Sequence, residues 1–366
     1  MNEPSKTPQT RRRFLKTMTP AAAAMAAAGA LAQPGERAGT FVPMDVKWPP
    51  AWLTWVASTT ACLKALDVDC DLADVAGMSG YAFVLNVPEG VNISGPTAFP
   101  WDLLNEGVRM LGRTTLVYRS PEFEGEEGPP IVVTPRTREH CRMAYEIVAR
   151  EIEAGRPCVV WGAYQPEFAV VVGVEDLKYH VKSSRQVLRQ AEEPIPFDGV
   201  IAPSGVYVLA FPTAAQVPQD GADLFAIRQA DALLRGAGPF APHLGLSAYD
   251  TWISALEENR AEPFGNAYCA QCFAEGRRLA RQFLAKVALR RPTITEPLNR
   301  AVAAYFEAEY AMADLAKLFP FPEGGQLADP AKRTQGAELL RAAKDAETRA
   351  AAAIAEAVGT GLAGQP

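Results

Sequence analysis

The chain has few histidines, no excess of positive charge and no apolar run long enough to span a membrane. Its 366 residues include only three histidines, His140, His180 and His243, which disfavours a multi-histidine metal centre. It has 36 basic and 42 acidic residues, a formal net charge of −6, so the global charge gives no support to a nucleic-acid-binding surface. Glycine-rich phosphate loops and metalloprotease helix motifs are also absent. We therefore expect no metal, no other cofactor and no nucleic-acid partner.

The composition that remains is typical of an ordinary globular protein. Hydrophobic residues make up 48% of the chain and charged residues 21%. These proportions exclude a disordered chain and a disulfide-dense miniprotein. The length is sufficient for two domains.

Residues 1–32 have the pattern of an export signal. Twin arginines followed by Phe14-Leu15-Lys16 resemble a twin-arginine signal, and small residues at 30–32 suit a signal peptidase. The alanine-rich run between them, from Pro20 to Ala32, is too short for the roughly 20 residues that a membrane-spanning helix needs. We expect residues 1–32 to be removed, leaving a periplasmic or secreted protein without an integral membrane segment; a retained anchor is the alternative.

The rest of the chain divides into two parts with different periodicities. Residues 42–215 mix short helical patterns with β-rich runs, which favours an α+β domain with a central antiparallel sheet. Residues 222–358 are helical throughout and predict an all-α bundle. The predicted helices of the first part are 58–66, 71–76, 100–111 and 136–153, and its predicted strands are 81–87, 158–161, 168–174, 179–181 and 206–211. In the second part, helices are predicted over 223–235, 266–288, 296–318 and 330–358, with a capping box at 247–250.

Four segments of the first part carry a family resemblance. They are residues 58–63 (STTACL), 71–83 (DLADVAGMSGYAF), 155–162 (GRPCVVWG) and 167–176 (EFAVVVGVED). Together they resemble the butirosin-biosynthesis H-protein N-terminal family, a branch of the papain-like cysteine peptidase and acyltransferase fold. The resemblance implies a cysteine nucleophile at a helix start, a histidine base at the start of a central strand, and a groove between them.

The residues at the matching positions depart from that pattern. Ser58 occupies the position of the nucleophile and Glu167 that of the histidine. The position that orients the histidine falls near Ser183 and Ser184, and the upstream oxyanion donor falls near Trp52. Without imidazole the usual acyl-transfer mechanism lacks a base tuned near neutral pH. We therefore expect a relative that has lost cysteine-protease chemistry and binds a small molecule or peptide.

Two alternatives stay open at this stage. In the first, the protein is an amide-bond hydrolase or acyltransferase that uses Cys62 with His180, or Ser58 with Glu167. A buried structural role for Cys62 competes with that reading. In the second, it is a secreted assembly protein whose Tyr249, Trp252 and Phe273 face a partner helix. Candidate ligand-binding residues of the groove are Trp55, Gly80, Tyr81 and Trp161, each of which could instead be structural.

Cys269 and Cys272 form the remaining notable spacing. A thioredoxin-type redox site would follow a strand, and a zinc site would need two further ligands, neither of which this pair has. We expect structural thiols here, with a disulfide or thiol chemistry as alternatives. The six cysteines of the chain allow fifteen full pairings, among which the sequence does not choose.

Overall fold

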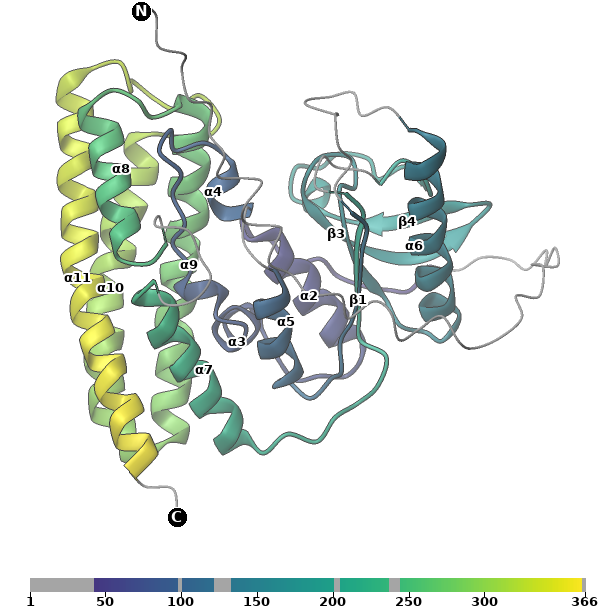
Figure 1. The fold of residues 1–366 in the computed structure, drawn as a ribbon, viewed down its shortest axis with the longest axis horizontal. Helices are drawn as coiled ribbons and strands as arrows, with labels where there is room; N and C mark the ends of the chain where they lie inside the picture. The colour runs from purple at the N-terminus through teal and green to yellow at the C-terminus, as the bar shows by residue number, and fades with distance from the viewer. Residues whose placement is uncertain (1–42, 98–100, 122–132, 201–204, 237–243, 364–366) are drawn as a thin grey trace, which may run out of the picture.

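The computed structural model describes residues 43–97, 101–121, 133–200, 205–236 and 244–363. The expected signal peptide, residues 1–32, and His243 lie outside these ranges. Within them the protein combines a sheet with a large helical part, so the predicted α+β class is confirmed (Figure 1).

One six-stranded antiparallel sheet lies in the part of the molecule opposite the long helices. Its strand order is β1-β6-β2-β3-β4-β5. The strands are β1 (Leu116–Arg119), β2 (Cys158–Trp161), β3 (Phe168–Glu175), β4 (Lys178–Lys182), β5 (Ile195–Pro196) and β6 (Tyr207–Ala210). Every pairing is antiparallel, which confirms the expected antiparallel sheet.

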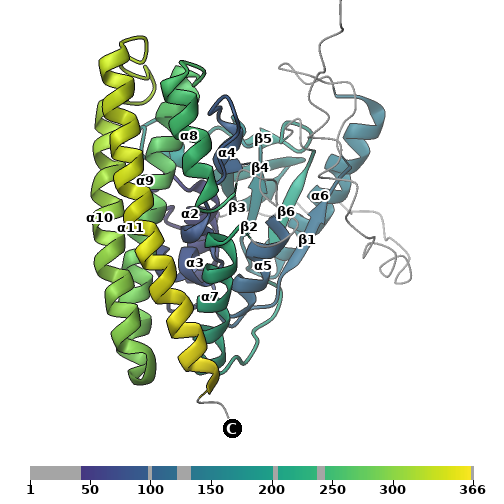
Figure 2. The same ribbon diagram turned by 60° about the vertical axis from the view of Figure 1, so that its left-hand side comes forward.

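Helices precede the sheet, interrupt it and follow it. Those of the first part are α2 (Thr54–Ala65), α3 (Leu72–Met78), α4 (Ser94–Thr97), α5 (Trp101–Arg109) and α6 (Pro135–Glu153), with 3-10 turns η2 (Tyr81–Phe83) and η3 (Ser184–Gln186). The second part consists of α7 (Gln219–Leu234), α8 (Ser247–Glu257), α9 (Pro263–Arg290), η4 (Pro292–Ile294), α10 (Thr295–Leu318) and α11 (Pro330–Ala363). Figure 2 shows α9, α10 and α11 running side by side as the body of the bundle.

The two faces of the sheet are covered by different helices. Because side chains alternate along a strand, Val170 faces α2 whereas Val171 faces α6. Helices α2 and α3 lie between the sheet and the bundle, with α6 on the far side (Figure 1). This arrangement explains why β3 is apolar on both faces.

The two parts predicted from the sequence share one hydrophobic core. Buried side chains of α2 and α3 join those of α7, α9, α10 and α11 in a single cluster. Contact between α3 and α9 is so close that a Cβ at Gly77 would overlap the ring of Phe283. The bundle therefore packs directly on α2 and α3 of the first part through this shared cluster.

A buried ion pair lies inside the bundle. Arg277 of α9 and Glu347 of α11 have no exposed surface, and Arg277 Nη2 lies 2.9 Å from Glu347 Oε2. The hydroxyls of Tyr249 and Tyr305 also donate to Glu347, at 2.7 and 2.9 Å. Arg277 additionally donates to the carbonyl of Val84, so the network ties the bundle to the first part.

Three local predictions are wrong. Residues 81–87 form η2 and a loop rather than a strand, because Gly80 adopts a φ of +82° and turns the chain toward α7. The capping box at 247–250 is absent: Ser247 is the first helical residue and its hydroxyl donates to the carbonyl of Leu244. Helix α2 begins at Thr54, one turn before Ser58, and neither Ser58 nor Thr59 caps it.

Candidate functional site

The start of α2 meets the start of β3. Thr54 is the first residue of α2, and Glu167 directly precedes β3. The Thr54 hydroxyl donates to Glu167 Oε2 at 2.6 Å, and it accepts a hydrogen bond from the Phe168 amide at 3.2 Å. One hydroxyl therefore joins the helix start to the strand and has both its donor and an acceptor site in use.

A phenol from the bundle completes the environment of Glu167. Tyr268 of α9 donates its hydroxyl to Glu167 Oε1 at 3.2 Å. Burial raises the pKa of Glu167, and the hydrogen bonds from Thr54 and Tyr268 lower it by less, so the net shift is upward. Among the described residues no cationic side chain acts on Glu167, although its side chain stays partly open to solvent. It is a poorly solvated carboxylate that only neutral hydroxyls stabilise.

A second carboxylate, Glu275 of α9, binds the backbone at the start of α2. The amide of Leu53 donates to Glu275 Oε2 at 2.8 Å, which supplies the cap that the helix lacks from its own side chains. Arg278 donates to the other oxygen at 3.0 Å. Burial raises the pKa of Glu275. The bundle thus fixes the position of the helix start.

An aromatic cluster lies beside this junction. Ring centroids are 6.1 Å apart for Trp55 and Tyr81, 4.7 Å for Trp101 and Phe168, and 4.6 Å for Trp161 and Phe168. Tyr81 and Trp101 connect the two halves at 5.7 Å. The indole nitrogens of Trp55 and Trp161 are buried and have no hydrogen-bond partner within the described part of the chain. Three of the four predicted ligand-binding residues, Trp55, Tyr81 and Trp161, therefore belong to one cluster.

The fourth, Gly80, has a structural explanation. A Cβ on Gly80 would lie 2.8 Å from the side chain of Leu233 on α7, and the positive φ disfavours any side chain there. Its role is to turn the chain and to let α7 approach.

Ser58 does not contact Glu167. It lies on the second turn of α2, is fully buried, and its hydroxyl accepts a hydrogen bond from the indole of Trp48 at 3.1 Å. The pairing predicted for Ser58 and Glu167 is wrong at the serine, because the helix begins one turn earlier and brings Thr54 to the carboxylate instead.

The environments of Cys62 and His180 do not suit the predicted roles of nucleophile and base. Cys62 is completely buried, and burial, followed by the nearby Cys158, raises the pKa of its thiol well above the usual value. His180 lies on β4 with Nε2 3.6 Å from a carboxylate oxygen of Glu175. A thiol of this kind is a small core side chain rather than a nucleophile, because the reactive species is the thiolate.

All six cysteines are buried and unpaired. Burial raises the pKa of both Cys269 and Cys272, which agrees with the structural role expected for the pair. The disulfide alternative is not formed.

The remaining predicted positions serve local structure. Ser183 donates its hydroxyl and its amide to Glu192 Oε1, at 3.0 and 2.6 Å. Ser184 accepts a hydrogen bond from Gln165 at 3.5 Å. Trp52 is 36% exposed and its ring lies edge-on to Phe321, at 5.2 Å between centroids.

Tyr249, Trp252 and Phe273 do not face outward. Their exposed fractions are 2% or less, and they pack inside the bundle among α8, α9, α10 and α11. The assembly surface predicted from these residues is therefore wrong.

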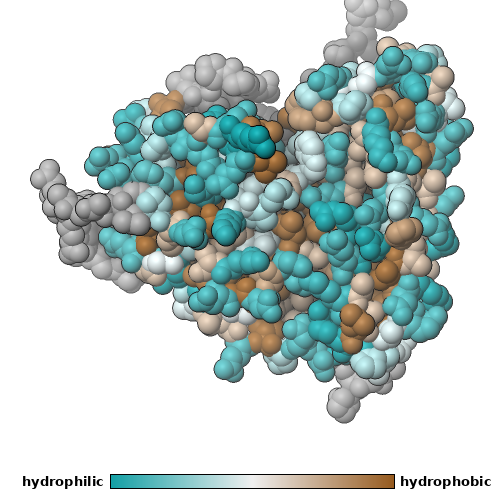
Figure 3. All heavy atoms as spheres, turned by 180° about the vertical axis from the view of Figure 1, so that it is seen from behind, coloured by the Kyte–Doolittle hydropathy of each residue, from teal (hydrophilic) through white to brown (hydrophobic). Residues whose placement is uncertain are grey.

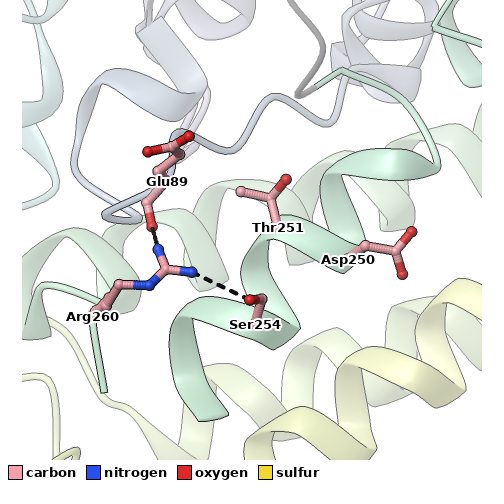
Figure 4. A pocket seen from close by; sticks show the side chains of 5 residues that line it. All are labelled: Glu89, Asp250, Thr251, Ser254 and Arg260. Atoms are coloured by element: carbon pink, nitrogen blue, oxygen red, sulfur yellow. Dashed lines mark hydrogen bonds between the residues drawn. The ribbon is translucent and has the colours of Figure 1, made fainter. Parts of the chain in front are cut away.

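Two described cavities lie away from the Thr54–Glu167 junction. Figure 4 shows the first, about 510 Å³, where the guanidinium of Arg260 lies between Glu89 and Ser254. Arg260 donates to the Glu89 carbonyl at 2.8 Å and to the Ser254 hydroxyl at 3.2 Å. The second, about 440 Å³, is lined by charged side chains that pair with one another, such as Lys286 with Asp74 at 2.8 Å. Arg260 in the first cavity and Lys286 and Arg290 in the second already have hydrogen-bond or ion-pair partners.

The part of the chain that the structure describes holds no group of three metal-ligating side chains and no helix with the length and apolarity to cross a membrane. On the face seen in Figure 3, hydrophobic side chains are interspersed with hydrophilic ones rather than gathered in one continuous patch.

No protein-family model matches the chain, and no curated protein matches it. Function therefore has to be argued from the junction itself. Sequence reasoning identified Glu167 but missed Thr54, Tyr268 and Glu275. Thr54 could have been found as a hydroxyl close behind Pro49-Pro50, where a helix can begin; the two α9 residues carry no local signal.

Proposed function

We propose that this is an exported, ligand-binding protein whose residues 42–215 form a papain-like domain that has lost cysteine-protease chemistry. Residues 222–358 form the helical bundle that supports it. The ligand binds where the start of α2 meets the start of β3. The family resemblance of the sequence and the meeting of a helix start with a strand start both support this reading.

The contact between Thr54 and Glu167 carries the proposal. In the papain-like arrangement proposed here, the Thr54 hydroxyl and the Glu167 carboxylate would take the places of the thiolate and the imidazole, and the two are joined by a 2.6 Å hydrogen bond. Thr54 is only 8% exposed. Its hydroxyl accepts a hydrogen bond from the Phe168 amide and donates one to Glu167, so an attack of this hydroxyl on a carbonyl would require breaking these bonds. Binding makes no such demand.

Covalent labelling tests the loss of chemistry. The purified protein is incubated with iodoacetamide, which alkylates thiolates, and separately with a fluorophosphonate, which phosphonylates activated hydroxyls with loss of fluoride. Intact mass spectrometry is expected to show no adduct on the folded protein, and alkylation of the urea-unfolded protein serves as the control. A stoichiometric adduct that disappears in Thr54→Val or Cys62→Ala would overturn the proposal.

A second candidate is an amide-bond hydrolase or acyltransferase that uses Thr54 and Glu167. The 2.6 Å contact and the raised pKa of Glu167 favour it, because a carboxylate with a raised pKa is a better base for a hydroxyl. Hydrolysis of p-nitrophenyl acetate that is lost in both Thr54→Val and Glu167→Gln would support it. Hydrolysis that persists unchanged in both site variants would point to a contaminating esterase instead, and the surface variant Glu307→Gln should retain the activity.

Export is proposed from residues 1–32. Expression of the full chain in a bacterium with a working twin-arginine pathway should yield a periplasmic protein shortened by these residues. Replacing Arg11, Arg12 and Arg13 by lysine should hold the protein in the cytoplasm at full length. Export that persists in this variant would contradict the twin-arginine route.

A further inference from the structure

Glu167 has unused capacity to bind a cation. A carboxylate accepts about four hydrogen bonds, and Thr54 and Tyr268 provide one to each oxygen. Neither of these donors carries a positive charge. A half-buried carboxylate without a cationic partner is incompletely solvated, so a ligand that brings a positive charge to Glu167 gains from pairing with it.

The titratable groups around Glu167 are acidic rather than basic. Tyr81 and Cys272 are near enough to interact with its charge, and Glu275 is near both of them. Arg278, the basic side chain close to this group, is bound to Glu275. The helix start contributes a partial positive charge, but its Leu53 amide is directed at Glu275. Tyr81 and Cys272 are uncharged near neutral pH, because burial raises their pKa values well above the usual range, so in the described part of the chain no basic side chain neutralises Glu167.

Aromatic rings form the solvent-facing side of the same junction. Phe321 lies 6.1 Å from Tyr268, 5.2 Å from Trp52 and 5.0 Å from Phe264, measured between ring centroids. Trp52 is 36% exposed and Phe264 49%. We call these four residues the aromatic rim. It is continuous with the carboxylate, because the Tyr268 hydroxyl binds Glu167. Aromatic faces attract ammonium groups and disfavour anions.

We propose, on the basis of the ligand-binding role above, that the ligand presents an organic ammonium group to Glu167 and rests its apolar part on the aromatic rim. The positive charge of the ligand pairs with the Glu167 carboxylate. Two of the ammonium hydrogens donate to the acceptor sites on the carboxylate oxygens that Thr54 and Tyr268 do not occupy. A free amine and the side chain of a lysine in a peptide share this chemistry.

Isothermal titration calorimetry with matched probes tests the proposal. Benzylamine and benzyltrimethylammonium carry the charge, whereas benzyl alcohol has a similar shape without it. Nα-acetyl-lysine methylamide represents a peptide lysine. We expect both benzyl cations to bind at pH 7.5 at least tenfold more tightly than benzyl alcohol. If the lysine compound binds more tightly than benzylamine, the ammonium group of the ligand comes from a peptide lysine. If it binds more weakly, the ligand is a small amine.

Variants locate the binding. Glu167→Gln keeps the shape and one acceptor oxygen but removes the charge, and should weaken benzylamine binding at least tenfold. Phe264→Leu removes a half-exposed ring of the aromatic rim and should weaken the binding of both benzyl cations several-fold with little loss of stability. Glu307→Gln, a surface carboxylate on α10, is the control and should leave binding unchanged.

The outcomes separate this inference from the proposed function. If benzyl alcohol binds as tightly as benzylamine and Phe264→Leu weakens its binding, the junction binds ligands but the ammonium class is wrong. Benzylamine binding that is insensitive to Glu167→Gln, or no binding of either cation, also overturns the inference. The proposed loss of chemistry is judged separately, by the labelling experiment.

Discussion

The hydroxyl of Thr54 lies 2.6 Å from the carboxylate of Glu167, across 113 residues of sequence. The same hydroxyl accepts a hydrogen bond from the Phe168 amide, so a single side chain holds the start of α2 against the start of β3. This contact has consequences for stability as well as for function.

Thr54→Val should destabilise the protein by about 1–3 kcal/mol, because the Phe168 amide loses its acceptor and Glu167 loses a donor in a buried place. Valine has nearly the same shape as threonine, so the loss reports hydrogen bonding rather than packing. Urea unfolding followed by circular dichroism measures it. Thr54→Ser keeps the hydroxyl and should retain most of the stability; an equal loss in both variants would refute the assignment.

The stability difference between the natural protein and Glu167→Gln should depend on pH. The pKa of Glu167 is raised in the folded state above its ordinary value of about 4.5, so folding favours the protonated acid. The stability from this group is present below about pH 4.5 and is lost as pH rises through the folded pKa. Glutamine does not titrate.

Urea unfolding of both proteins at several pH values tests this dependence. The natural protein should lose stability relative to the variant between pH 4.5 and neutral pH. Other acids with raised pKa values, such as Glu275, contribute equally to the free energy of unfolding of both proteins, so their contributions cancel in the difference. A difference that stays constant or grows in favour of the natural protein would show that Glu167 is well stabilised as an anion.

Breaking the buried ion pair of the bundle should be more damaging than removing it. Arg277→Met alone leaves the Glu347 charge buried with only two tyrosine hydroxyls, at an expected cost of about 3–5 kcal/mol. The double variant Arg277→Met/Glu347→Leu should recover part of that loss. Thermal unfolding of the three proteins compares them, and a double variant less stable than the single one would disagree with this account.

The six thiols should resist modification in the folded protein. All are buried, and burial raises the pKa of even Cys70, which keeps 5% of its surface exposed, to about 12. Ellman's reagent at pH 8 is expected to react slowly without denaturant and to release six equivalents in guanidinium chloride. Fewer than six under denaturing, non-reducing conditions would reveal a disulfide.

Sequence patterns predicted the regular elements well where local signals were strong. Strand β2 has the predicted bounds, 158–161, because Pro157 and Gly162 mark its two ends. The long helices α9, α10 and α11 were predicted within a few residues, since their apolar faces extend over many turns.

Long-range contacts account for what the sequence could not show. Helix α2 begins at Thr54 because Glu275, more than 200 residues away, binds the amide of Leu53. Residues 81–87 resemble a strand in composition, yet Leu85 and Val87 are apolar because the bundle core surrounds them. The sequence predicted Glu167 as a site residue. It gave no signal for Tyr268, because this side chain reaches Glu167 from α9, 101 residues away in the sequence.

The charge state of Glu167 is the quantity on which the account depends most. Carbon-13 NMR of protein labelled at the glutamate carboxyl groups, with Glu167 assigned by its absence in Glu167→Gln, measures its pKa directly. We expect Glu167 to titrate above about 4.5 in the free protein and to have a lower pKa in saturating benzylamine, because the bound cation stabilises the anion. Titration of the free carboxyl at or below its ordinary value, unmoved by the amine, would contradict it.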